Sequence, residues 1–313
     1  MVPFFMEYHL TTEPPLVTSI LITYNHKNSI AKALDSMLAQ KTDFKHKILI
    51  EDDCSTDGTT QICCNYASRF PGKVEFSPKQ ENLGIVGNVY SGISKVDSEF
   101  YAVLEGDDYW CDDLKLQKQA DALKANPDCS FCGHNTRFVG QDGLERPLFS
   151  SKKHNIREKY SFPKRFYSKR NIVKIHPSSR FYRTSCLDLN SLKYKDTVVW
   201  DSSSFWYFLS KGNFFYIDEI MSVYHYNGLG VFSGSSNIRQ RYMATLNLMN
   251  INEEFNFIYN HVFMPSILKH RKSIGISFWD SLAFKYNLSA NFNKYNQLKK
   301  RIESYLQYST CKN

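Results

Sequence analysis

Three carboxylates fall within four residues of the sequence, in the run Glu105-Gly106-Asp107-Asp108. The run directly follows residues 100–104, an apolar and aromatic segment typical of a buried strand. Like charges crowded at a strand end are unfavourable unless a cation lies among them. Mg²⁺ typically binds one or two carboxylates together with substrate phosphates. The run therefore predicts a Mg²⁺ or Mn²⁺ site for a phosphate-bearing substrate, with a solvated acidic turn as the alternative.

Two earlier segments also place polar side chains where a buried strand is expected to end. Residues 17–23 end in Tyr24-Asn25, and residues 47–50 are stopped by Glu51-Asp52-Asp53. In open α/β sheets, ligands bind outside the carboxyl ends of the strands. We therefore expect these side chains to meet the acidic run at one edge of a sheet.

Strands and helices must alternate along the chain to bring these residues together. Amphipathic or capped segments predict helices that begin at Ser29, after Gly58, at Gly84, at Leu114 and at Asp201. Strands are expected between them, with further ones at residues 74–76, 130–139 and 214–226. The lone CxxC pair, Cys129 and Cys132, is interpreted as part of a strand. The alternation predicts an α/β fold with a mostly parallel sheet flanked by helices.

Four short segments carry a resemblance to a known family. They are residues 20–25, residues 50–59, Asn82-Leu83-Gly84 with Asn88, and residues 104–110. In this order and spacing they resemble the family 2 glycosyltransferases of GT-A (Rossmann-like) fold, over roughly residues 16–230. The resemblance implies an inverting, metal-dependent transferase that uses a nucleotide-sugar donor, with UDP-sugars as the first candidates.

The resemblance also implies roles for individual residues. Tyr24 would lie against the base of a uridine or similar nucleotide, and Asp53 would accept a hydrogen bond from its edge. On the residues alone, Tyr24 could instead pack on the next helix and Asp53 could cap one. The implied nucleotide-binding residues are Thr23, Tyr24, Asn25, Asp52, Asp53, Gly84, Asn88 and Asp107, and the implied metal ligands are Asp107, Asp108 and Glu105, the last replacing the family's usual first aspartate.

The acceptor side rests on a later block that begins at Asp201. In the family, the aspartate at this place is the catalytic base, although Asp201 could simply cap its helix. Trp200, His176, Ser178 and Ser179 are further acceptor-side candidates. After Tyr224, many relatives have an arginine and then a histidine two positions further on. His225 and Asn227 depart from that pattern, so no role is carried over to them.

Domain organisation and charge suggest a catalytic body with a basic addition. Residues 1–235 form the expected GT-A domain, with a nucleotide-sugar half (16–127) and an acceptor half (128–235), and residues 236–313 form a helical C-terminal extension. Of the net charge of +8, residues 151–175 contribute nine Lys/Arg against Glu158, and residues 255–313 contribute nine against Asp280 and Glu303. Both segments could face something anionic or simply be solvated, and the amphipathic basic helix around residues 298–306 could lie on an anionic membrane leaflet or pack on the body.

The expected function is transfer of a sugar to a glycan or lipid-linked acceptor. No apolar run is long enough to span a membrane and the start lacks a basic leader, so we expect a cytoplasmic protein with peripheral contact at the inner face of the plasma membrane. A nucleotidyltransferase acting on sugar phosphates and a nucleic-acid-binding protein are the alternatives. We expect no nucleic-acid partner, because the strand-end carboxylates would repel phosphates without a metal. The oligomeric state is left open.

Overall fold

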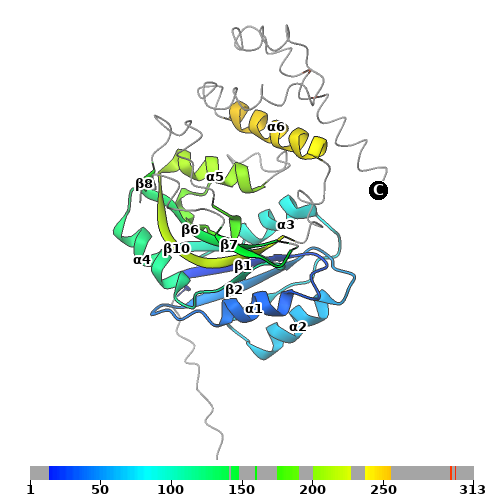
Figure 1. Ribbon diagram of the computed structural model, residues 1–313. Coiled ribbons are helices and arrows are strands. Elements are labelled where there is room, and N and C mark those ends of the chain that lie inside the picture. The colour runs from blue at the N-terminus through cyan, green and yellow to red at the C-terminus, as the bar shows by residue number, and fades with distance from the viewer. Residues whose placement is uncertain are drawn as a thin grey trace, which may run out of the picture.

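The computed structural model describes residues 14–140, 142–147, 159–160, 175–189, 200–226 and 237–254, together with Gln297 and Lys300. The chain forms a twisted sheet with helices on both faces (Figure 1). The expected α/β class, a sheet flanked by helices, is confirmed. Most of the basic segment 151–175 (residues 151–158 and 161–174) and most of the expected extension 236–313 beyond residue 254 lie outside the described residues.

The first half of the sheet is entirely parallel. Its strands are ordered β3 (Val74–Phe76), β2 (His46–Asp52), β1 (Val17–Thr23) and β4 (Phe100–Glu105). All seven residues of β1 are buried. A strand covered on both faces tends to be apolar along its length, and β1 contributes Val17, Ile20, Leu21 and Ile22 together with small buried hydroxyl residues.

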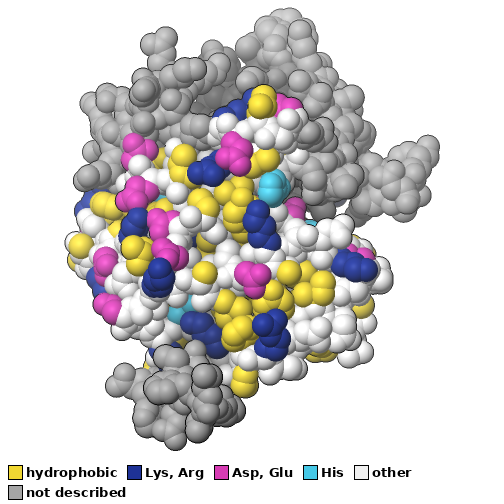
Figure 2. All heavy atoms as spheres, turned by 60° about the horizontal axis from the view of Figure 1, so that its bottom comes forward, with side chains coloured by type: hydrophobic (Ala, Val, Ile, Leu, Met, Phe, Trp, Pro, Cys, Tyr) yellow, Lys and Arg dark blue, Asp and Glu magenta, His cyan; other side chains and the backbone are white. Residues whose placement is uncertain are grey.

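Successive residues of β1 face opposite sides of the sheet and so enter two different cores. Leu21 belongs to a core cluster that includes residues of helices α1 (Ile30–Leu38), α2 (Thr59–Arg69) and α4 (Lys115–Ala125). Ile20 and Ile22 belong to a second cluster that includes residues of α3 (Gly84–Ile93), α5 (Trp200–Lys211) and α6 (Asn237–Glu254). Each face of the sheet therefore carries its own helical layer. Figure 2 shows one face of the molecule, on which hydrophobic, basic and acidic side chains are interspersed.

The second half of the sheet is mixed, which differs from the mostly parallel expectation. β9 (Phe181–Arg183) runs antiparallel to both β4 and β6 (Cys129–Val139), and β5 (Tyr109–Trp110) runs antiparallel to β10 (Asn213–His225). Among the described strands of this half, only β6 and β10 pair in parallel. Parallel neighbours need a long crossover. The short β5 and β9 pair instead with strands distant in sequence, which local patterns do not reveal.

Two small strands and two 3₁₀ turns complete the described structure. β7 (Glu145–Pro147) pairs with β6, and β8 (Lys159–Tyr160) pairs with β10. The 3₁₀ turns cover Pro177–Ser179 and Thr184–Cys186. Within the described part of the chain, no helix has the length and apolar character needed to cross a bilayer.

Most helix boundaries match the sequence expectations, and one strand end does not. The α1 helix follows Ser29, and α5 ends where the Gly212 N–H donates to the Phe208 carbonyl at 3.2 Å. Cys129 and Cys132 lie buried in β6, which confirms that they are strand residues. β2, in contrast, continues through Asp52 rather than stopping before Glu51.

Candidate active site

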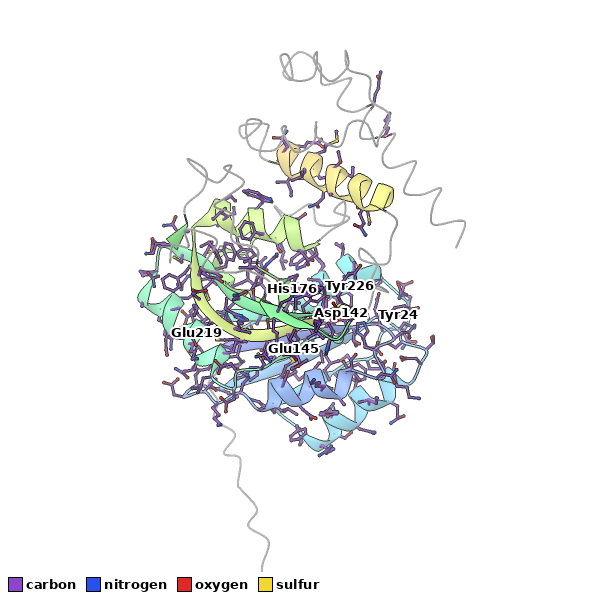
Figure 3. The ribbon with its side chains drawn as sticks, in the orientation of Figure 1. Tyr24, Asp142, Glu145, His176, Glu219 and Tyr226 are labelled. Carbon is purple, nitrogen blue, oxygen red and sulfur yellow. The ribbon has the colours of Figure 1, made fainter. Side chains whose placement is uncertain are left out.

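A cavity of about 330 Å³ opens at the carboxyl ends of β1, β2 and β4. Three segments distant in sequence meet there, because parallel strands end at one edge of a sheet. Figure 3 shows Tyr24 at this edge, near α3. The lining residues are Ile22, Thr23, Tyr24, His26, Asp53, Asn82, Gly84, Ile85, Asn88, Glu105 and Asp107.

The turn after β1 presents Tyr24 to the cavity. Its side chain is 46% exposed and lines the cavity. Asn25 holds the turn in the left-handed region at φ 57°, where its Oδ1 accepts the Thr56 N–H at 2.8 Å. Asn25 therefore ties two loops together and does not itself line the cavity.

The two aspartates at the end of β2 have different surroundings. Asp53 lines the cavity and accepts the Leu83 N–H at 2.7 Å. Both carboxylate oxygens of Asp52 instead accept hydrogen bonds, from the hydroxyl groups of Ser55 and Thr60. Asp52 thus fixes the following loop and lies outside the cavity lining.

The start of α3 forms another wall of the cavity. Gly84 has φ +72°, a conformation that side chains rarely adopt, and its N–H is accepted by Asn82 Oδ1 at 3.1 Å. Asn88 is 3% exposed and donates to the Glu51 carbonyl at 2.9 Å. Its Oδ1 accepts Lys79, which pairs at 2.8 Å with the fully buried carboxylate of Glu51. A buried charge network therefore holds Asn88 in place.

The side chains of the acidic run point in two directions. Glu105 and Asp107 line the cavity, whereas Asp108 turns inward and its Oδ1 accepts the His225 N–H of β10 at 3.2 Å. Burial and the charges of Asp201 and Asp107 raise the pKa of Glu105 well above its usual value. Burial and the charges of Glu105 and Asp107 likewise raise the pKa of Asp108. Without a counter-cation, these carboxylates disfavour one another's ionisation.

This arrangement fits a hard divalent cation that the ligand helps to bind. Asp108 Oδ2 is buried and has no hydrogen-bond partner within the part of the chain that the structure describes. Among the described residues, no three His, Cys, Asp or Glu side chains converge to hold an ion by themselves. Mg²⁺ and similar ions commonly take one or two protein carboxylates and complete their coordination with phosphates and water. The residues present therefore fit the implied metal.

His26 is a cavity residue that the sequence analysis missed. Its Nδ1 lies 3.1 Å from Thr23 Oγ1, and its Nε2 lies 4.0 Å from Asp107 Oδ2. A Cβ on Gly106 would lie 2.7 Å from both the ring Nδ1 and the Thr23 hydroxyl, so only glycine fits between them. The position of His26, two residues after Tyr24 in the turn that follows β1, could have indicated that it lines the cavity. Asn82, Ile22 and Ile85 also line the cavity.

Asp201 lies in the first turn of α5. Burial raises its pKa, and the nearby Arg180 guanidinium opposes that rise. Arg180 donates to the Asp201 carbonyl and, at 3.1 Å, to Ser204 Oγ, which fixes this turn. The charge of Asp201 contributes to the raised pKa of Glu105, so the two carboxylates share one electrostatic environment. Trp200 is only 4% exposed and belongs to the core.

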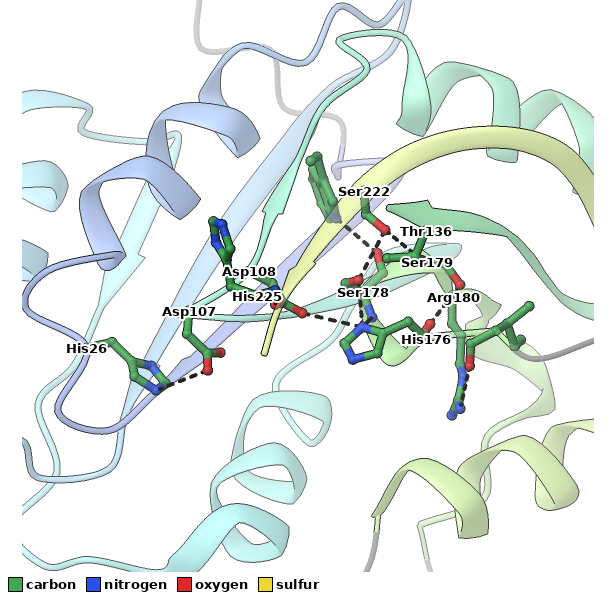
Figure 4. Close-up of polar contacts among 12 residues, drawn as sticks. His26, Asp107, Asp108, Thr136, His176, Ser178, Ser179, Arg180, Ser222 and His225 are labelled. Carbon is green, nitrogen blue, oxygen red and sulfur yellow. Dashed lines mark hydrogen bonds and ion pairs between the residues drawn. The ribbon is translucent and has the colours of Figure 1, made fainter. Parts of the chain in front are cut away.

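His176, Ser178 and Ser179 lie behind Asp108 rather than on an open acceptor surface (Figure 4). His176 Nδ1 is 3.4 Å from Asp108 Oδ2, and the ring stacks on Tyr224 with centroids 4.2 Å apart. Burial and Arg180 lower the pKa of His176 to about 3, so the imidazole is neutral at pH 7. His225 contributes its backbone N–H to Asp108, and Asn227 lies outside the described residues.

Comparison with known proteins adds a family and a fold. The family model described as "Glycosyl transferase family 2" matches residues 18–188, more than half of the chain. An uncharacterized protein of Mycobacterium tuberculosis is 38% identical over 130 residues, which are 42% of this chain and 38% of that protein. The chain thus matches well under half the length of that relative.

Two solved structures share the fold. TarS of S. aureus in complex with UDP-GlcNAc has a TM-score of 0.55 at 17% identity, covering 93% of this chain and 91% of TarS. A mannosyltransferase from Pyrobaculum calidifontis, in complex with GDP-Man and Mn²⁺, has a TM-score of 0.54 at 16% identity, covering 96% and 88% of the two chains. At these identities the likeness shows the GT-A type of fold.

Proposed function

The chain belongs to glycosyl transferase family 2, and on that premise we propose that it moves a sugar, with inversion, from a UDP-sugar to a hydroxyl of a glycan or lipid-linked acceptor. The sugar would be a hexose or an N-acetylhexosamine. The observation that carries the proposal is the convergence of Tyr24, Asp53 and Asp107 on one cavity, together with the electrostatic coupling of Asp201 to the cavity residue Glu105.

The donor would lie along the edge of the sheet. Tyr24 offers an exposed aromatic face to a base, and Asp53 keeps one carboxylate oxygen, Oδ2, outside its bond to Leu83. A carboxylate accepts hydrogen bonds only, so it suits the N–H of uracil. TarS, whose structure contains UDP-GlcNAc, supports testing UDP donors first.

Asp201 would act as the base on the acceptor hydroxyl. As the acceptor oxygen attacks the anomeric carbon, the bond from that carbon to the diphosphate oxygen breaks. The hydroxyl proton passes to the Asp201 carboxylate, and the bonding electron pair leaves with the diphosphate. A carboxylate whose pKa is raised by burial is a stronger base than an exposed one, which suits this role.

Glu105 and Asp107 would hold Mg²⁺ or Mn²⁺ together with the diphosphate, supported by Asp108. When bound, the ion supplies the positive charge that offsets the charge growing on the leaving group. The mannosyltransferase of the same fold, whose structure contains Mn²⁺, supports a metal of this kind.

The chain would divide into a donor part, an acceptor part and an extension. Residues 16–127 would form the donor half, residues 128–235 the acceptor half and residues 236–313 a helical extension. A lipid-linked acceptor would place the reaction at the cytoplasmic face of the membrane, with the basic residues 255–313 against anionic lipid.

A panel of nucleotide sugars tests the proposed function. Purified protein with Mn²⁺ is mixed with UDP-, GDP- and dTDP-sugars, and release of the nucleoside diphosphate is measured. We expect release from a UDP-sugar that EDTA abolishes and added Mn²⁺ restores. Release of pyrophosphate from an NTP and a sugar phosphate, with none from any nucleotide sugar, would contradict the proposal.

A further inference from the structure

A chain of buried hydroxyl groups leads away from the acidic run into the sheet (Figure 4). His176 Nδ1 lies 2.9 Å from Ser178 Oγ, and Ser178 Oγ donates to Ser222 Oγ at 3.1 Å. Ser222 Oγ lies 3.0 Å from Thr136 Oγ1. Ser178, Ser222 and Thr136 are at most 1% exposed, and none of the three lines the donor cavity.

The sheet register explains why these hydroxyls meet. Ser222 of β10 is the direct neighbour of Thr136 on β6 and of Trp110 on β5. Trp110 Nε1 in turn donates to the Ser178 carbonyl at 3.1 Å, and Ser179 Oγ donates to the His176 carbonyl at 2.7 Å. Three strands and one 3₁₀ turn therefore fix the position of His176.

At the end nearest the acidic run, the hydroxyl chain meets the carboxylate of Asp108 through His176. Asp108 Oδ2 is buried, lacks a hydrogen-bond partner among the described residues and lies 3.4 Å from His176 Nδ1. Buried acceptors without a donor are costly, and a neutral imidazole can supply one N–H at either nitrogen. The Ser178 N–H, 3.4 Å from Nδ1, favours the tautomer in which that nitrogen accepts. The position of Asp108 Oδ2, a buried acceptor that lacks a donor in the described part of the chain and lies 3.4 Å from the same nitrogen, favours the opposite tautomer.

Hydroxyl groups can adapt to either tautomer, since each both donates and accepts. When Nδ1 carries the hydrogen, Ser178 accepts from the ring, donates to Ser222, and Ser222 donates to Thr136. This direction agrees with the bond from Ser178 to Ser222. In this tautomer the single Nδ1 hydrogen is shared between two acceptors, Ser178 Oγ at 2.9 Å and Asp108 Oδ2 at 3.4 Å.

We propose that His176 is a positioning residue for the acidic run, held by the Ser178–Ser222–Thr136 hydroxyl chain so that it supports Asp108 while Asp107 and Glu105 take up metal and diphosphate. This deepens the proposed function and rests on it. It gives His176 and Ser178 a role different from acceptor binding. Substitution of residues that orient metal-binding groups in this way commonly weakens metal binding by about 10- to 100-fold.

Thr136 provides a matched pair of variants at the remote end of the chain. Thr136→Val keeps the shape and removes the hydroxyl, whereas Thr136→Ser keeps the hydroxyl and removes a methyl group. Mn²⁺ binding in the presence of UDP is measured by electron paramagnetic resonance, and UDP binding without metal by calorimetry. We expect Thr136→Val to weaken Mn²⁺ binding about tenfold, Thr136→Ser to bind it like wild type, and metal-free UDP binding to be unchanged in both.

A second pair covers the case in which Thr136→Val does not fold. His176→Asn can place an amide N–H close to the position of Nδ1, and His176→Ala cannot. Asparagine is expected to retain most of the Mn²⁺ affinity that alanine loses.

The inference is overturned if Thr136→Val binds Mn²⁺ as tightly as wild type, or if valine and serine weaken it equally, which indicates packing alone. Equal losses in both His176 variants would also overturn it. If the wild-type protein releases UDP from a donor and Thr136→Val binds Mn²⁺ as tightly as wild type, only this inference fails and the proposed function stands. Wild-type protein that binds no Mn²⁺ with UDP contradicts both.

Discussion

At the scale of single residues, the described site separates carboxylates by environment rather than by type. Asp53 and Asp107 line the cavity, Asp52 and Asp108 are buried and accept hydrogen bonds, and Asp201 shares the electrostatic environment of Glu105. Each environment suits a different role, whether accepting a hydrogen bond from a base, binding an ion, holding a loop or taking a proton.

Asp201→Asn tests the proposed proton acceptor. The amide keeps the size of the side chain but cannot accept the proton, so we expect kcat to fall about 1,000-fold while KM for the donor changes little. Steady-state kinetics with the donor found by the panel measures both constants. An unchanged kcat would show that Asp201 only caps its helix.

Gly106→Ala tests the close approach of His26 and Thr23 to the acidic run. The added Cβ would lie 2.7 Å from each of them, so we expect a loss of about 1–3 kcal/mol in the free energy of unfolding and weaker UDP binding. Urea unfolding and calorimetry measure the two effects. Gly143→Ala is the control: nothing lies within 4 Å of its Cβ position, so the left-handed backbone at φ +71° should cost about 1 kcal/mol and leave UDP binding unchanged.

At the scale of elements, α3 and β2 are joined through one buried carboxylate. Glu51 of β2 pairs with Lys79 at 2.8 Å and Lys95 at 2.6 Å, and it accepts Ser91 Oγ at 2.9 Å. The helix comes this close because Gly92 has no side chain: a Cβ there would lie 2.6 Å from Ile20. The wall of the cavity near Asn88 therefore depends on an ion pair inside the fold.

Glu51→Gln tests this connection. A neutral amide leaves two lysines without their counter-charge, so we expect the free energy of unfolding to fall by about 3 kcal/mol, with weaker UDP binding through Lys79 and Asn88. Chemical denaturation and calorimetry give the two values. Glu75→Gln removes the exposed partner of Lys47, which also lies 3.7 Å from Asp97, and should change stability by less than about 1 kcal/mol. Equal effects of both substitutions would contradict the interpretation.

The elements also show what the sequence could and could not predict. Strand ends are visible as apolar runs that stop at polar residues, so Tyr24, Asp53 and Asp107 could be expected at one edge. The direction of each side chain is not visible in such a pattern, and Asp52 and Asp108 point away from the cavity although their neighbours enter it. The antiparallel β5 and β9 depend on partners far along the chain, such as Ser222 and Tyr101, which local residue patterns do not encode.

At the scale of the whole molecule, a buried lysine links stability to pH. Lys115 is fully buried at the start of α4, where its Nζ donates to Gln119 at 2.6 Å and lies 4.2 Å from the Trp110 ring centroid. Burial lowers its pKa to about 7, well below the value of about 10.4 in an unfolded chain. Below pH 7 the lysine is charged in both states, and its burial opposes folding fully. Between pH 7 and about 10 the folded protein loses this proton first, so the opposition decreases.

Lys115→Met is therefore expected to raise Tm more at pH 6 than at pH 9. Methionine has a similar shape and no charge to bury, so its advantage shrinks as the native lysine becomes neutral. Thermal unfolding of both proteins at the two pH values measures the difference. A Tm difference that is the same at both pH values would show that the buried lysine keeps one charge state throughout.

The hydrogen bond from His225 to Asp108 also has a consequence in time. The two residues are 117 positions apart, and β5, which directly follows Asp108, pairs with β10. A ribosome adding about 5–20 residues per second needs on the order of ten seconds to go from one to the other. During that interval the emerging chain carries its acidic run before the strand that fixes it has been made. The site is thus completed late in synthesis, and a product interrupted before residue 225 has the donor-side residues without a finished centre.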